Sequence, residues 1–147
     1  MPMLHDAAFR ESAKARIKSL RADSPRRWGK MSVDQMLWHV NCLLENAVGR
    51  FPIKAIKLPI PNAIARFVVI NLPWRKGNTP TAPEVIARQS YDLESERTKT
   101  LKLIDEFATK PVDSAWGDSS FLGPLGGHDW SRLQGKHVDY HLKQFGV

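Results

Sequence analysis

The sequence predicts an all-α fold, a four-helix bundle with a short extra helix in the connection between the second and third main helices. Four stretches repeat apolar residues at intervals of three and four, which is the spacing of one helix face. Capping patterns precede the later three stretches. No stretch has the pattern of a strand, so we expect no sheet beyond a marginal two-stranded ribbon. Four amphipathic faces of this length bury one another in a bundle.

The first helix is expected over residues 7–21, and it is amphipathic. Its apolar face is formed by Phe9, Ala13, Ile17 and Leu20. Its opposite face is basic and carries Arg10, Lys14, Lys18 and Arg21. The helix is expected to stop before Pro25, because proline restricts the residue before it to extended geometry.

The second helix has the clearest start signal in the chain. Ser32 and Gln35 form a capping box, with Met31 and Met36 placed as a hydrophobic staple. We expect the helix to run to about Val48. Six prolines then interrupt residues 50–83, where only a short apolar helix from Asn62 to Ile70 is expected.

The third main helix is predicted to begin at a second capping box, Thr81 with Glu84, and to reach about Ala108. Its inward positions are expected to be Ile86, Leu93, Leu101, Ile104 and Phe107. The last helix should begin at Gly126 as N-cap and run to Phe145.

Composition is typical of a globular protein, and we expect one domain over residues 1–147. Hydrophobic residues make up 42% of the chain and charged residues 25%. Cys42 is the only cysteine, so an intramolecular disulfide is excluded. No apolar run is long enough for a signal peptide or a bilayer span. We therefore expect a cytoplasmic protein without a membrane partner.

The net charge of +7 is concentrated at the start of the chain. Residues 1–30 contribute eight basic against three acidic side chains, and the rest contributes fourteen against twelve. The basic face of the first helix is interpreted as its solvated side. The alternatives are a nucleic-acid footprint or attraction of an anionic substrate. Because no aromatic residues interleave with the basic face and no nucleic-acid motif is present, nucleic acid is not an expected partner.

Three histidines are candidates for a metal site. His137 and His141 lie four residues apart on the last helix, so both rings can reach one ion. The pair alone is weak evidence, since solvated histidines share this spacing. His39 lies at the edge of the apolar stripe of the second helix, where a core histidine bonded to a carbonyl is the simplest interpretation. Three inward imidazoles without partners would be costly to bury, however, and a metal ion removes that cost.

Other candidates are weaker. Cys42 follows His39 by three residues and could approach the ion, but a free cysteine usually packs as a small hydrophobe. His5 and His128 are expected to be exposed. Gln144 could line the pocket or hold the end of the helix. Three aromatic residues could line a substrate cavity, although aromatics at helical spacing are more often core: Trp38, Trp130 and Tyr140.

Several motifs together resemble the DinB/YfiT-like superfamily of metalloenzymes, in a branch of unassigned function. They are Arg26-Arg27-Trp28-Gly29-Lys30-Met31-Ser32, Gln35-Met36-Leu37-Trp38-His39, Pro73-Trp74-Arg75-Lys76-Gly77, Asp129-Trp130, and the run from Lys136 to Gly146. The similarity extends from Arg16 to the C-terminus, with one histidine on the second helix and H-x-x-x-H on the last, in the superfamily's order.

The resemblance implies a four-helix bundle in which His39, His137 and His141 bind a divalent ion, usually zinc or nickel. Such a site keeps an open coordination position, as catalytic sites do. It further implies transfer of a low-molecular-weight thiol to a small electrophile, with hydrolysis as the alternative and a homodimer as a common assembly. The non-enzymatic alternative is a small-ligand or nucleic-acid binding bundle with a structural metal. No residue has a sequence position that identifies it as a general acid or base.

Overall fold

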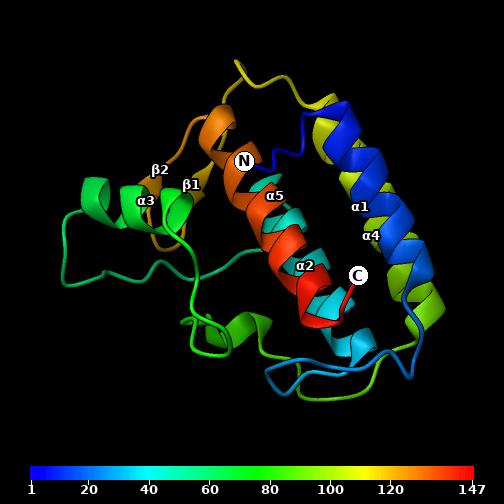
Figure 1. The fold of residues 1–147 in the computed structure, drawn as a ribbon. Coiled ribbons are helices and arrows are strands. Elements are labelled where there is room, and N and C mark those ends of the chain that lie inside the picture. Colours follow the sequence, from blue (N-terminus) through cyan, green and yellow to red (C-terminus); the bar gives the residue numbers. More distant parts are fainter.

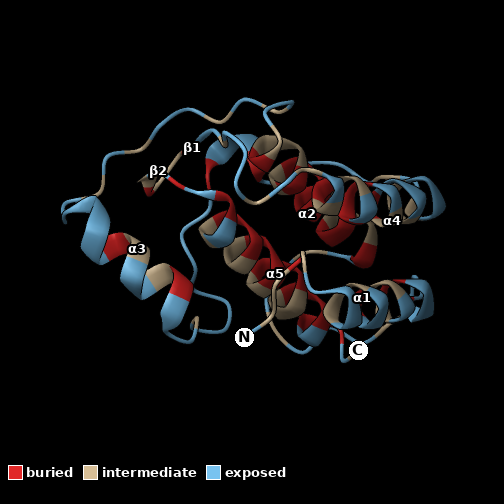
Figure 2. Ribbon diagram, turned by 90° about the horizontal axis from the view of Figure 1, so that it is seen from above, coloured by how far each residue is buried: buried red, intermediate tan, exposed pale blue.

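The computed structural model describes residues 1–147 and shows four main helices in a bundle (Figure 1). They are α1 (Ala7–Ser19), α2 (Val33–Ala47), α4 (Leu93–Thr109) and α5 (Gly127–Gln144). Each packs against two neighbours, so that the order around the bundle is α1, α4, α2, α5. Seen from above, buried residues line the inner sides of all four (Figure 2). The predicted helical bundle is confirmed at this level.

The core lies along the bundle axis and is built by the predicted apolar faces. Its largest fully buried side chains include Ile17, Leu20, Met36, Leu37, Leu44, Ile104, Phe107, Trp130 and Leu142. Arg97 of α4 crosses to the end of α1, where its guanidinium donates hydrogen bonds to the carbonyl oxygens of Ile17 and Leu20. This contact adds hydrogen-bond donors at the C-terminal end of α1, which lies two residues before the predicted end.

The start signals of α2 and α5 are confirmed. The backbone N–H of Ser32 donates to Oε1 of Gln35 at 3.1 Å, and Met31 packs on the core that contains Met36. Gly126 is the N-cap of α5 in extended geometry. Both starts place the histidines that follow them: each helix begins at a defined residue, so the face on which each histidine lies is also defined.

The predicted start of the third main helix is wrong. Thr81 precedes a single 3₁₀ turn, η1 (Pro83–Val85), which contains Glu84. Helix α4 has Asp92 as its N-cap, eleven residues after Thr81. The Asp92 carboxylate accepts from the backbone N–H of Ser95 at 2.9 Å. Glu84 instead accepts from the backbone N–H of Lys54. Ile86, predicted to point inward, is exposed because no helix carries it to the core.

The connection between α2 and α4 contains the predicted short helix, α3 (Asn62–Asn71), which packs against α5 outside the bundle (Figure 1). The only sheet is a two-stranded ribbon, which is within the limit that the sequence predicted. It pairs β1 (Asp118–Ser119) with β2 (Gly123–Pro124) in antiparallel register. No helix is both long and apolar enough to cross a bilayer.

Candidate metal centre

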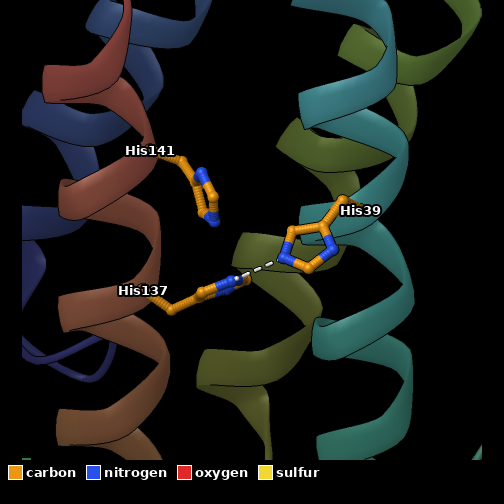
Figure 3. Close-up of side chains that lie close together, drawn as sticks. All are labelled: His39, His137 and His141. Atoms are coloured by element: carbon orange, nitrogen blue, oxygen red, sulfur yellow. Dashed lines mark hydrogen bonds between the residues drawn. The ribbon is translucent and has the colours of Figure 1, made fainter. Parts of the chain in front are cut away.

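The fold brings His39, His137 and His141 together between α2 and α5 (Figure 3). His39 lies in the middle of α2, and the other two lie one turn apart on the facing side of α5. All three are buried, with 6–8% of each residue exposed. They form the only cluster of three or more histidine, cysteine, aspartate or glutamate side chains with converging ligand atoms.

The three rings face one another closely. Nε2 of His39 lies 3.0 Å from Nε2 of His137. The ring centroid of His141 lies 4.6 Å from that of His137 and 5.0 Å from that of His39. One nitrogen from each ring lies within 4.8 Å of the others. Three nitrogens at these separations could hold one ion.

Hydrogen bonds determine which nitrogens are free to bind. Nδ1 of His39 lies 2.8 Å from the carbonyl oxygen of Val85. A carbonyl only accepts, so Nδ1 carries the proton and Nε2 keeps its lone pair. Nδ1 of His141 donates in the same way to Oε1 of Gln144 at 2.8 Å, which leaves its Nε2 free. Metal-binding histidines commonly donate their second N–H to a carbonyl-type oxygen in this manner.

His137 differs from the other two histidines. Because Nε2 of His39 is an acceptor, the 3.0 Å contact is a hydrogen bond that Nε2 of His137 donates. To bind an ion through Nε2, His137 would carry its proton on Nδ1 instead. Nδ1 of His137 is buried and has no hydrogen-bond partner. Gln134, one turn earlier on α5, likewise buries an Oε1 atom without a partner. These two unsatisfied atoms mark the part of the cluster whose polar groups are not paired within the protein.

The donor set passes a simple test of fit for a divalent ion. Imidazole nitrogens bind zinc at about 2.0–2.1 Å, so two of them on one ion are roughly 2.8–3.4 Å apart at bond angles between octahedral and tetrahedral values. The separation of 3.0 Å between the Nε2 atoms of His39 and His137 agrees with this range. Imidazole suits zinc, nickel, copper and iron, so the donor set does not select one of them.

Burial keeps the cluster neutral. Loss of hydration lowers the pKa of all three imidazoles, and that of His141 falls to about 3. The neighbouring histidines lower the pKa of His137 and His141 further, because two imidazolium charges at this distance repel. The three rings are therefore uncharged imidazoles at neutral pH, and this is the form that binds a metal ion.

Gln144 orients His141. The sequence leaves the role of Gln144 open between lining the pocket and holding the end of the helix. Its Oε1 accepts from His141, while its Nε2 donates to the carbonyl oxygen of Trp28 at 2.9 Å. Gly29 follows Trp28 with a positive φ of 81°, and a Cβ atom there would collide with the amide of Gln144. The loop before α2 thus holds the orienting amide, and only glycine fits at position 29.

An aromatic group covers one side of the histidines. The indole of Trp74 lies 6.1 Å from the ring of His137, and the ring of Tyr140 lies 5.2 Å from that of His141, both between centroids. The Tyr140 hydroxyl accepts from Nε1 of Trp28 and from the backbone N–H of Gly77 and donates to the carbonyl oxygen of Arg75. The connection after α3 is thereby fastened to α5.

The other sequence candidates lie elsewhere. Cys42 packs beside Ala82 and Val85 outside the cluster, and burial raises its thiol pKa to about 12. Trp38 stacks on Tyr91, and Trp130 is core, donating to the carbonyl oxygen of Gly117. These placements agree with a packing role for each of the three residues.

Of the two remaining histidines, one differs from expectation. His128 is exposed as predicted. His5 is half-buried: its Nε2 bonds to the carbonyl oxygen of Lys110, and its ring contacts Phe107 and Trp116. The prediction of an exposed His5 is therefore wrong, because the segment before α1 folds back over the end of α4.

Several charges on the basic face of α1 are used within the molecule. Lys14 forms ion pairs with Glu11 and Asp105, and Arg10 donates to the carbonyl oxygen of Leu4. Arg21 pairs with Asp23. These contacts favour the interpretation of the face as a solvated, internally paired surface.

Comparisons with protein-family models, curated proteins and solved structures find no match for this chain. The histidine cluster is therefore the feature of the chain from which a function can be inferred. Two observations bear on whether that cluster is catalytic. No fourth histidine, cysteine or carboxylate completes it. Two surface hollows, one along α4 and one beside α3, are lined by other residues.

Proposed function

We propose that this chain is a metal-dependent enzyme of the DinB-like type that transfers a low-molecular-weight thiol to a small electrophile. The observation that carries the proposal is the set of three neutral, buried imidazoles without a fourth protein ligand. A divalent ion held there would supply a Lewis acid with an open position for a thiolate or a water molecule. His39, His137 and His141 would hold the ion, with zinc or nickel as the expected metals.

The chain's own residues supply positioning. Val85 and Gln144 hold the Nδ1–H groups of His39 and His141, so that both Nε2 atoms face the centre of the cluster. Burial excludes water from the rings and keeps them unprotonated. No carboxylate or thiol joins the cluster, so a thiol substrate would itself provide the nucleophile. Cys42 is excluded from that role because its thiol stays protonated at neutral pH.

The second candidate is a binding protein with a structural metal. The observation that favours it is that neither hollow described above borders the histidines. The hydrolase alternative differs only in the nucleophile, water in place of a thiol, and requires the same three ligands.

A metal-loaded activity screen tests these alternatives. Wild type and His141→Ala are assayed with small electrophiles plus several thiols, and with generic esters. The exposed His128→Ala is the matched control for loss of a histidine on the same helix. We expect thiol-dependent turnover that is lost in His141→Ala and kept in His128→Ala. Thiol-independent ester cleavage would support hydrolysis. Tight metal binding that requires His141, without turnover of any substrate, would favour the structural role. Turnover that survives the loss of both His141 and the metal would refute the site.

A further inference from the structure

The outward side of α3 is apolar, although it faces away from the protein. Ile64, Phe67 and Val68 are 53%, 60% and 40% exposed, and Ile60 and Leu72 continue the exposed apolar surface beyond the two ends of the helix. Five of the seven large apolar side chains that the chain exposes lie here. Figure 2 shows α3 at the edge of the molecule with exposed residues along its length.

This pattern differs from ordinary surface apolarity. Single exposed apolar residues are common and need no explanation. Here Ile64, Phe67 and Val68 recur at helical spacing, so they form one face of α3, away from the face on which Ala65 and Val69 pack inward. A helix that is apolar on both sides is normally buried on both sides. The outward face of α3 therefore has the composition of a contact surface.

The charge around α3 has one sign. Residues 46–83 contain six basic side chains and no acidic one. Arg50 is paired with Glu106, and Lys54 lies near Glu84. The other four form no ion pair: Lys57, Arg66, Arg75 and Lys76. Lys57 precedes α3 and Arg75 and Lys76 follow it, so basic residues flank the helix in the sequence on both sides. The ammonium of Lys76 lies 4.9 Å from the centre of the Trp28 ring. Asp118 and Lys57 line the same hollow.

The orientation of α3 is fixed by contacts on its inner side. The Lys136 ammonium of α5 donates to the carbonyl oxygens of Val69, Ile70 and Leu72, the last turn of the helix, at 2.6, 3.3 and 2.5 Å. Arg132 donates to Oδ1 of Asn71 at 2.6 Å. A cation at a helix C-terminus also complements the helix dipole. These contacts hold the apolar face outward.

We propose that α3 and its basic flanks dock the protein on the surface of an anionic lipid bilayer. An apolar helix face with flanking lysine and arginine residues is the composition of interfacial helices, whose apolar side enters the headgroup boundary while the basic groups meet anionic headgroups. A second copy of this chain fits the face less well, because it would bring two unneutralised basic groups of side chains together. Because α3 lies at the edge of the molecule, its apolar face forms a convex surface, and a lipid surface can deform to fit it.

This inference differs from the sequence-based expectation of no membrane partner. That expectation rested on the lack of a bilayer span, and an interfacial helix needs none. The proposal also stands apart from the metal site, since no ligand histidine lies on α3. Failure of one leaves the other unaffected.

Vesicle flotation of the full-length protein tests the proposal. The probes are vesicles of phosphatidylcholine alone and of phosphatidylcholine with phosphatidylglycerol. We expect binding to the anionic vesicles that weakens as salt is raised, with little binding to the neutral ones. Phe67→Asp and, separately, Lys57→Glu should each weaken binding by at least about fivefold, since one unit of charge near such a surface contributes about 1 kcal/mol. The first change adds an acidic group to the apolar face, and the second reverses a charge beside it.

Lys18→Glu is the matched control, because it makes the same charge change at an exposed, unpaired lysine of α1. It should alter vesicle binding less than twofold. Ile64→Asp repeats the apolar test at a second position, and circular dichroism verifies that each variant is folded. The proposal is overturned if anionic vesicles do not bind the protein at low salt, or if Phe67→Asp and Ile64→Asp bind like wild type. It is also overturned if those variants dissolve a dimer without changing vesicle binding, since the face would then join two copies.

Discussion

At the scale of single residues, the histidine cluster depends on side chains that orient the rings. His39 and His141 each donate Nδ1–H to an oxygen, from Val85 and Gln144 respectively. The backbone oxygen cannot be removed by substitution, but the amide can. Gln144 is therefore the position at which orientation of the cluster can be tested without removing a ligand.

Gln144→Leu is expected to weaken zinc affinity by about 10- to 100-fold, because loss of a hydrogen-bonded partner behind a ligand histidine has effects of this size. Competition against a zinc-binding dye measures the affinity. Gln144→Glu keeps an acceptor oxygen and is expected to retain affinity. Equal affinity of Gln144→Leu and wild type would show that the amide does not orient His141.

A second prediction concerns pH. The pKa values of the three histidines are lower in the folded protein than in the unfolded chain, where they are about 6.5. Below about pH 6.5 the unfolded chain binds protons that the folded chain does not. The free energy of unfolding of the metal-free protein should therefore fall as pH falls below 6.5, by up to about 1.4 kcal/mol per pH unit for each histidine.

Urea unfolding between pH 7.5 and pH 5 measures this dependence, above the range in which carboxylates titrate. His141→Leu should have a shallower slope by about 1.4 kcal/mol per pH unit, because one of the buried bases is gone. His128→Leu, at an exposed position, should keep the wild-type slope. A stability that does not change across this interval would contradict the buried, neutral state of the cluster.

At the scale of elements, the start of α4 shows that a capping pattern in the sequence does not always begin a helix. Thr81 and Glu84 have the sequence of a capping box, but the Thr81 hydroxyl donates only to the carbonyl oxygen of Thr79 at the surface. Asp92 makes the N-cap contact that begins the helix. Prolines at positions 80 and 83 limit the segment to extended geometry and a single turn.

We expect Asp92→Ala to lower the free energy of unfolding by about 1 kcal/mol, the usual contribution of an aspartate N-cap. Thr81→Ala should change it by less than about 0.5 kcal/mol, as at other surface positions. Chemical denaturation of both variants tests the assignment. A larger loss for Thr81→Ala than for Asp92→Ala would mean that the helix begins where the sequence pattern placed it.

At the scale of the whole molecule, the histidines join α2 to α5 through a site buried in the bundle. An ion that binds the folded chain and not the unfolded one stabilises the fold by mass action. The two ligand-bearing helices are separate in sequence, so a bound ion would also act as a cross-link between them.

Zinc at about 100 times its dissociation constant is expected to add about 2.7 kcal/mol to the free energy of unfolding. For a chain of this length the melting temperature should rise by roughly 5–10 °C. Differential scanning calorimetry with zinc and then with excess chelator measures the shift. His137→Ala should abolish it, while His128→Ala should retain it. A shift that persists in His137→Ala would place the ion elsewhere.

The sequence by itself predicted the helical bundle, the short extra helix and the inward-facing positions of His39, His137 and His141, because helix faces follow from local rules. Spacing of three and four defines a helix face, and a clear start such as Ser32 defines which residues lie on it. The start of α4 was not predicted, because the capping pattern at Thr81 indicated a start that the neighbouring prolines limit to a single turn, and Asp92 is the N-cap instead.

Only the tertiary structure decided what surrounds the histidines and α3. Val85, Trp28 and Gln144 belong to segments far apart in the chain, and their contacts with the cluster depend on where the loops cross it. The apolar sequence of α3 resembles that of a buried helix. Only the tertiary structure shows that one face of α3 is exposed. The other four helices fill the core, so α3 can bury just one side, against α5.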